Sequence, residues 1–291
     1  MKHFMKHFTI HYVFLILAGI FIGTIGLFVK LGGSAVNPFV LGFYRVFFAF
    51  LLLLIISPLI DKSTFKVKNK NLKEDALIGL LFAINFTGTN IAFLLAPIQN
   101  IALILSMTPI FVLIFAYFML SEKITKNKVV TLIIALIGLV ILNPLRPEGF
   151  WGNIIALFIV ASGGFMFTLL RKINRDESIG NVFWFFLFAT LFMLPFPLIL
   201  GFGRPNMSIV SLGIISTGAA YLFYNLGYEK VEAEVGNMIT NIVTPITAIL
   251  FAFLVLDEPV YRNVLIGGGI LVVAAVYLST HIKRPHKIRH G

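Results

Sequence analysis

One uncharged stretch constrains this chain more than any other feature. Between Asp75 and Glu122 lie 46 consecutive residues that include no Asp, Glu, Lys or Arg. As an α-helix, which rises about 1.5 Å per residue, this stretch would be about 70 Å long, more than twice the ~30 Å hydrocarbon core of a bilayer. We therefore predict that it forms two membrane-spanning helices joined by a turn near Ala96 and Pro97.

The composition supports the same class of protein. The chain is 59% hydrophobic and 12% charged, whereas soluble domains carry about 25% charged residues. Lipid cannot hydrogen-bond a bare backbone, so each span must close its own hydrogen bonds as a helix. A membrane β-barrel would instead show segments of about ten residues with alternating hydrophobicity. Because the apolar runs are continuous, we predict an all-α polytopic membrane protein.

Charge and cysteine content exclude several other classes. The absence of cysteine excludes disulfides, iron–sulfur clusters and thiolate metal sites, and we expect neither a cofactor nor a bound metal. The net charge of +11 does not indicate nucleic acid, because the basic residues cluster in short segments between apolar runs, where they orient the spans. The run from His7 to Val29 has 23 residues, longer than the ~7–15-residue core of a signal peptide, so we predict a retained first span.

The uncharged runs predict ten spans. Their expected bounds are Ile10–Val29, Pro38–Ile60, Asp75–Leu95, Gln99–Leu120, Lys128–Asn143, Phe150–Leu170, Ile179–Leu200, Met207–Gly227, Val235–Leu256 and Tyr261–His281.

The distribution of Lys and Arg predicts the orientation. If the N-terminus is cytoplasmic, the inside segments hold 18 of the 23 Lys and Arg residues and the outside segments hold 4, while Arg45 lies within a span. Basic residues are enriched on the cytoplasmic side, so both termini are expected in the cytoplasm, with the protein in the cytoplasmic membrane. An odd number of spans would place the basic C-terminal segment outside, which favours ten.

The second half of the chain repeats the first. With an offset of 136 residues, segment 108–127 matches segment 244–263 at 8 of 20 positions without a gap. We therefore predict two units of five spans, residues 1–146 and 147–291. Because five is odd, the second unit must enter the membrane from the opposite side, and such inverted repeats support alternating access to a site near the midplane.

Two duplicated segments and one motif carry a family resemblance. The segments are Thr108–Lys123 and Thr244–Pro259, each leading into a Gly- or Ala-rich helix, and the motif is Phe43-Tyr44-Arg45 in the second span. On these residues the chain resembles the EamA-like ten-helix members of the drug/metabolite transporter superfamily. The resemblance covers nearly the whole chain and implies a basket-like bundle whose central cavity is lined mainly by spans 1, 3, 4, 6, 8 and 9.

Polar side chains on these spans are the candidate substrate-binding residues. Span 9 has the clearest polar face, because four of its polar residues (Asn237, Thr240, Asn241 and Thr244) recur at helical spacing and share one side. Amides that face lipid are costly, so this stripe is expected to line a wet cavity; hydrogen bonds between helices are the alternative. The predicted substrate-binding residues are Asn85, Thr89, Asn90, Asn100, Ser106, Ser162, Tyr221, Tyr224, Asn225, Asn237 and Asn241.

Five further residues are predicted to have gating or structural roles. They are Arg45, Pro109, Pro245, Glu122 and Glu258. The two prolines fall mid-span, where each would remove a backbone hydrogen bond and kink the helix, as a hinge or as a static bend. The two glutamates fall at span ends, as caps or gate contacts. The intramembrane Arg45 has four open roles: snorkelling, capping carbonyls of another helix, pairing with Glu258, or binding a substrate carboxylate.

These features predict a secondary transporter of small metabolites, with amino acids or drug-like solutes as substrates, acting as an exporter or exchanger by alternating access. The alternative is a proton- or sodium-coupled importer of a sugar, nucleobase or choline-like compound. An intramembrane enzyme or a channel is not expected, because the six His residues lie near predicted cytoplasmic ends and no span carries paired acids. The expected partners are a small-molecule substrate and the lipid bilayer, with the chain as a monomer or homodimer.

Overall fold

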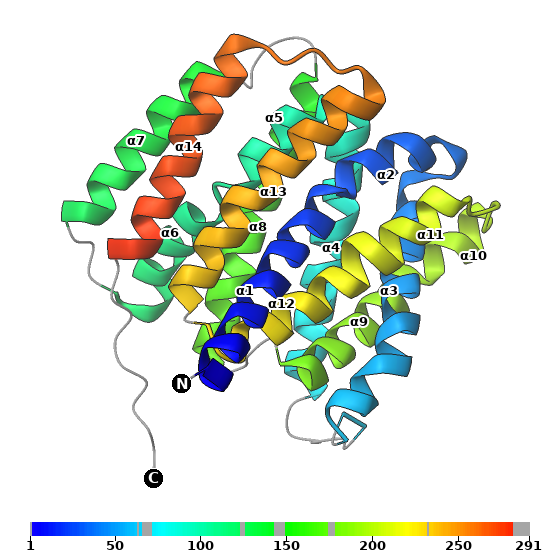
Figure 1. Cartoon of the computed structure of the whole chain (residues 1–291). Helices are drawn as coiled ribbons and strands as arrows, with labels where there is room; N and C mark the ends of the chain where they lie inside the picture. The colour runs from blue at the N-terminus through cyan, green and yellow to red at the C-terminus, as the bar shows by residue number, and fades with distance from the viewer. Residues whose placement is uncertain are drawn as a thin grey trace.

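The computed structural model describes residues 2–62, 64–65, 72–122, 126–142, 149–173, 178–231 and 233–281, and the regular structure in these ranges is entirely helical (Figure 1). The predicted all-α class is thus confirmed. The predicted end of the fifth span at Asn143 and the predicted boundary between residues 146 and 147 lie outside the described residues.

The helices follow one another with short connections. In chain order they are α1 (Lys2–Gly23), α2 (Ile25–Gly32), η1 (Gly33–Ala35), α3 (Pro38–Ile60), α4 (Leu72–Leu95), α5 (Ile98–Leu105), α6 (Thr108–Leu120), α7 (Lys126–Leu142), α8 (Phe150–Lys172), α9 (Ile179–Met193), α10 (Pro195–Leu200), α11 (Met207–Gly213), η3 (Ile214–Ala219), α12 (Ala220–Tyr228), α13 (Ala233–Leu256) and α14 (Arg262–His281).

Eight helical stretches in the described part of the chain are long and apolar enough to cross a membrane. They are Ile10–Ala35, Pro38–Ile60, Leu72–Leu95, Ile98–Leu120, Phe150–Lys172, Ile179–Leu200, Met207–Tyr228 and Ile239–Leu256. They coincide with eight predicted spans, and two shorter apolar helices, Val129–Ile141 and Arg262–Ala274, fall on the remaining two. The turn predicted at Ala96 and Pro97 is present, since α4 ends at Leu95 and α5 begins at Ile98.

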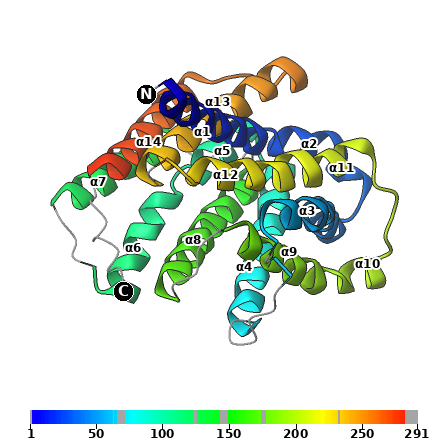
Figure 2. The same cartoon turned by 60° about the horizontal axis from the view of Figure 1, so that its bottom comes forward.

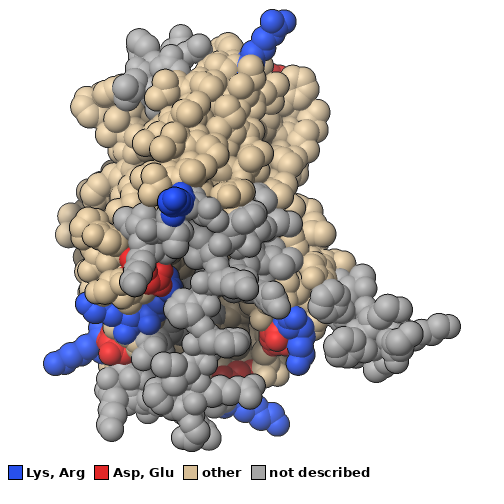
Figure 3. Space-filling model, turned by 90° about the vertical axis from the view of Figure 1, so that its left-hand side faces the viewer, with Lys and Arg blue, Asp and Glu red and all other residues tan. Residues whose placement is uncertain are grey.

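The surface is that of a protein immersed in lipid. Large apolar side chains point outward on several helices, including Val140 at 76% exposure and Ile199 at 79%. Exposing such side chains to water costs free energy, whereas exposing them to hydrocarbon does not. Figure 3 shows a broad area without charged side chains, while most of the Lys and Arg drawn in it lie toward the lower end of the molecule, where α1 begins in Figure 1. The helical stretches therefore form a multi-pass membrane protein.

Glycine permits close packing around α1 and α8. A Cβ added to Gly19 would lie 2.9 Å from the Cβ of Val243, and one added to Gly164 would lie 2.5 Å from the Cβ of Phe111. The first contact joins α1 to α13, which run side by side in Figures 1 and 2, and the second joins α8 to α6. Small residues at membrane helix contacts let backbones approach closely where no hydrophobic force draws helices together.

Four of the predicted spans are interrupted along their length. The first breaks at Thr24 between α1 and α2, the fourth at Ser106 and Met107 between α5 and α6, and the seventh at Leu194 between α9 and α10, while the eighth contains the π-helical turn η3. These interruptions correct the prediction for Pro109: it does not lie in a helix interior but in the first turn of α6, where its missing N–H costs nothing. Its repeat equivalent, Pro245, does lie inside the unbroken helix α13.

The ends of α6 and α13 have the same local geometry. Ser121 and Asp257, which the offset of 136 aligns, are the only non-glycine residues with positive φ in the described ranges, at 54° and 53°. The next residue closes each cap, because the Glu122 N–H donates to the Ala116 carbonyl at 3.3 Å and the Glu258 N–H donates to the Ala252 carbonyl at 3.0 Å. Left-handed backbone costs a residue with a Cβ about 1–2 kcal/mol. The sequence likeness of the two segments therefore extends to a strained feature of their structure.

Candidate functional site

Asn85 and Ser162 meet across the interface of α4 and α8. The Asn85 Nδ2 donates to Ser162 Oγ at 3.2 Å and to the Leu81 carbonyl at 2.8 Å. Gly163 lies opposite, where an added Cβ would be 3.5 Å from Asn85 Oδ1. The structure thus brings together two of the predicted binding residues, from two helices that are separate in sequence.

A second polar cluster joins α12 to α13. Asn237 Oδ1 accepts a hydrogen bond from Tyr228 at 2.6 Å and a longer one from Tyr224 at 3.3 Å, and the rings of the two tyrosines lie 4.4 Å apart. The predicted residues Tyr224 and Asn237 are therefore in contact. Tyr228, which is not among the predicted binding residues, supplies the shorter of the two bonds.

Tyr221 extends this cluster into an aromatic wall. Its ring lies 5.4 to 6.1 Å from those of Phe82 and Phe86 on α4 and Phe186 on α9. The edge-on geometry of these pairs, with interplanar angles of 67° to 81°, is the arrangement that ring quadrupoles favour. Tyr221 therefore connects the second half of the chain to the first.

Other predicted binding residues hydrogen-bond within their own helices. Thr89 donates to the Asn85 carbonyl at 2.7 Å, Asn225 to the Tyr221 carbonyl at 2.9 Å, and Ser106 to the Ala102 carbonyl at 3.0 Å. Asn100 is buried and Asn241 is half-buried on α13. On the predicted stripe of α13, Thr244 instead reaches another helix and donates to the Gly19 carbonyl at 3.3 Å, so part of the stripe packs against α1.

Arg45 is buried at the junction of α3, α4 and the π turn. Its side chain is 2% exposed. Nε donates to Thr217 Oγ1 at 3.0 Å, and Nη1 donates to Asn90 Oδ1 at 2.8 Å and to the Phe86 carbonyl at 3.4 Å. The guanidinium also lies 4.5 Å from the centre of the Phe86 ring, a cation–π contact.

These contacts agree with one of the roles that the sequence left open for Arg45, capping a carbonyl of another helix. In the described part of the chain Arg45 forms no ion pair with Glu258, whose Oε2 accepts from the Ile98 N–H at 2.9 Å. Asn90, which was expected to contact substrate, binds Arg45. Thr217 was not anticipated, although the polar Ser216-Thr217 pair within an apolar span was a signal that could have drawn attention to it.

Glu122 and Glu258 each have a partner in the other half of the chain. Glu122 forms an ion pair with Arg171 at the end of α8. Glu258 caps the first N–H of α5, where the helix dipole favours a negative charge. Both predicted gate residues thus contact a helix end in the other half of the chain.

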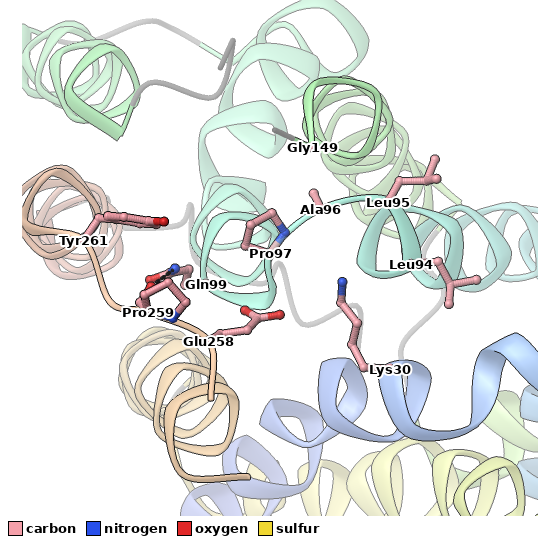
Figure 4. A pocket seen from close by; sticks show the side chains of 10 residues that line it. All are labelled: Lys30, Leu94, Leu95, Ala96, Pro97, Gln99, Gly149, Glu258, Pro259 and Tyr261. Carbon is pink, nitrogen blue, oxygen red and sulfur yellow. Dashed lines mark hydrogen bonds between the residues drawn. The ribbon is translucent and has the colours of Figure 1, made fainter. Parts of the chain in front are cut away.

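A pocket of about 250 Å³ opens beside Glu258, and we call it the Lys30–Glu258 pocket (Figure 4). Its lining comes from the ends of α2, α4 and α13 and the starts of α5, α8 and α14, and consists of Lys30, Leu94, Leu95, Ala96, Pro97, Gln99, Gly149, Glu258, Pro259 and Tyr261. Burial raises the pKa of Glu258 above its ordinary value of 4.5, against the opposing effects of the Ile98 N–H and the charge of Lys30.

Comparison with known proteins now gives the class. The model of the EamA-like transporter family matches residues 9–143 and 150–280, which together are most of the chain. A multi-pass helical protein with this match is a membrane transporter, and the chain belongs to the EamA-like transporter family, as the resemblance implied.

Several relatives are similar over most of their length. An uncharacterized transporter of Clostridium kluyveri is 27% identical over 96% of each chain, and one of Archaeoglobus fulgidus is 31% identical over 61% of this chain and 66% of its own. An S-adenosylmethionine uptake transporter of Rickettsia prowazekii is 22% identical over 89% of this chain and 88% of its own. One crystal structure superposes with a TM-score of 0.64 at 18% identity, covering 93% and 97% of the two chains, which shows the shared fold.

Replacing Arg45 by Lys should destabilise the protein. A single ammonium cannot reach the three oxygens that the guanidinium holds on two other elements, and each lost bond to a charged group costs about 1.5–3 kcal/mol. We expect a clearly lower thermal unfolding midpoint in detergent. Arg171→Lys is the matched control, since Arg171 is partly exposed and such pairs contribute about 0–1 kcal/mol. Equal midpoints for the two variants would contradict the assigned role of Arg45.

The raised pKa of Glu258 predicts a pH-dependent stability. The folded chain binds the Glu258 proton more tightly than the unfolded chain, so the free energy of unfolding falls as pH rises from about 4.5 through the raised pKa. Glu258→Gln should lack this component. The unfolding midpoint of the variant should therefore rise relative to that of the parent protein as the pH is raised to 7. Asp257→Asn, at the exposed neighbouring position, controls for the loss of one negative charge; the same gain in that variant would refute the prediction.

Proposed function

We propose that the chain is a secondary carrier that moves small amino-acid-like solutes across the cytoplasmic membrane by alternating access between two inverted repeats. The observation that carries the proposal is the duplication itself: the family model matches twice, and the equivalent residues Ser121 and Asp257 adopt the same left-handed cap. Two equivalent units that differ in how they pack can exchange conformations, which is the physical basis of alternating access in inverted repeats.

The positions of the two caps support opposite insertion. In Figure 1 the end of α13 lies at the top of the bundle, and the end of α6 lies toward the bottom, where α1 begins. The excess of Lys and Arg near the termini favours that end as cytoplasmic. Glu122 then faces the cytoplasm and Glu258 faces outside.

The polar clusters of α4, α8, α12 and α13 are the proposed substrate path. They offer amides, hydroxyls and tyrosine rings, which suit neutral or zwitterionic solutes better than solutes with a large net charge. The rickettsial relatives named as S-adenosylmethionine uptake transporters support a substrate with an amino-acid group, and they favour import in place of the export expected from the sequence. A carrier without ion coupling moves solute in either direction, as the gradient dictates.

Counterflow in proteoliposomes tests the carrier proposal. Vesicles preloaded with unlabelled L-amino acid should accumulate labelled amino acid transiently, with a rate that saturates in solute concentration. A linear ohmic current without counterflow would identify a channel instead. Asn85→Leu and Asn241→Leu should each lower the rate about two- to tenfold, the effect of losing roughly one hydrogen bond of 0.5–1.5 kcal/mol. The matched control is Thr190→Val, which removes a hydroxyl bonded to its own helix and should leave the rate unchanged.

Accessibility labelling tests the inverted orientation. Because the chain has no cysteine, single variants Lys126→Cys and Arg262→Cys, both at exposed positions, can be labelled without background. A membrane-impermeant maleimide applied to intact cells should modify Arg262→Cys and should reach Lys126→Cys only after permeabilisation. Labelling of both from the same side would show that the second unit is not inverted.

A further inference from the structure

The Lys30–Glu258 pocket places opposite charges on facing walls. Figure 4 shows the Lys30 ammonium on α2 and the Glu258 carboxylate after α13 extending toward the same opening. The charge of Lys30 acts on Glu258, yet in the described part of the chain the two groups form no ion pair. The pocket therefore separates two charges that would otherwise attract one another into contact.

A similar pair of groups meets at the other end of the molecule. Glu122 is the repeat equivalent of Glu258, and Arg171 lies in the last turn of α8, as Lys30 lies in the last turn of α2. At each end of the molecule, a basic residue from one half of the chain thus lies near an acidic residue from the other half. Arg171 and Glu122 are in direct contact, whereas a pocket separates Lys30 from Glu258.

The size and polarity of the gap define what can fill it. About 250 Å³ is just below the ~300–1,000 Å³ of pockets for drug-sized ligands, so the occupant is small. A simple anion would be attracted by Lys30 and repelled by Glu258, and a simple cation the reverse, so a molecule with both charges is favoured. The pocket wall adds Gln99, whose side-chain Oε1 is buried without a hydrogen-bond partner among the described residues.

We propose that this pocket binds a small zwitterion of the α-amino-acid type, with its carboxylate on Lys30 and its ammonium on Glu258. The bound solute bridges two groups from different repeat units, and so replaces at this end the direct ion pair that Glu122 and Arg171 form at the other. Its role as the entry site rests on the proposed carrier function, whereas binding itself is measured without transport.

Titration of the purified full-length chain in detergent tests the site. Glycine and L-alanine should bind and raise the unfolding midpoint, while acetate and methylammonium, which each carry one of the two charges, should bind at least about tenfold more weakly. Binding of acetate or methylammonium as tight as that of glycine would overturn the proposal, as would the absence of zwitterion binding.

Charge exchange assigns the binding to this pocket. Lys30→Glu leaves two carboxylates in the pocket, so this variant should lose affinity for glycine and bind 1,3-diaminopropane, which carries two positive charges. Glu258→Lys leaves two ammonium groups, so it should lose affinity for glycine and bind malonate, which carries two negative charges. The double variant Lys30→Glu with Glu258→Lys should bind glycine again, in reversed orientation. Because it restores one charge of each sign, it also tests the site if a single variant fails to fold. Lys126→Glu is the control for net charge and should bind glycine as the parent does.

The outcomes separate this inference from the carrier proposal. Unchanged ligand preference in folded Lys30 and Glu258 variants, together with saturable counterflow in the parent, would refute the pocket and leave the carrier in place. Ligand exchange as described, without any counterflow, would support the pocket and refute the carrier.

Discussion

The structure depends on one property of its solvent: hydrocarbon offers no hydrogen bonds, so a polar group freed inside the bilayer must find a partner in the protein. Three of the four interrupted spans illustrate this requirement. Where α1 ends, Thr24 donates to the Phe21 carbonyl at 2.7 Å; where α6 starts, Thr108 donates to the Leu105 carbonyl at 2.7 Å; and in the π turn, Thr217 donates to the Leu212 carbonyl at 2.9 Å. At three of the four interrupted spans, a threonine hydroxyl thus donates to a carbonyl of the preceding turn.

The same property explains the surroundings of Arg45. A cation in an apolar interior persists only when its donors are satisfied, and here the partners come from α4 and from η3 in the other half of the chain. The π turn is part of this arrangement, because Thr217 donates to Leu212 while it accepts from Arg45. The guanidinium therefore joins the two halves at a point where one helix is already irregular.

The sequence predicted those parts of the fold that follow from local composition. Uncharged runs located the helical stretches, because exclusion of charge is a property of each segment alone. Contacts between segments were less accessible: Thr217 lies 172 residues from Arg45, and no local pattern identifies it as the partner. Asn90 illustrates the limit, since a carboxamide in a span predicts a hydrogen bond but not whether a solute or an arginine receives it. Helix interruptions were missed for a related reason, because Thr and Ser fit a continuous helix equally well until a neighbouring helix determines where it breaks.

The left-handed residues at Ser121 and Asp257 make each glutamate a rigid extension of its helix. Their φ angles and the closing bonds from the Glu122 and Glu258 N–H groups fix the backbone of each glutamate to the helix, and the contacts with Arg171 and the Ile98 N–H hold the carboxylates. The helix α13 has 24 residues and is therefore about 36 Å long, so a tilt of about 10° around its far end would carry the carboxylate about 6 Å. A small change in the tilt of one helix is therefore enough to form or break an ion pair at its end.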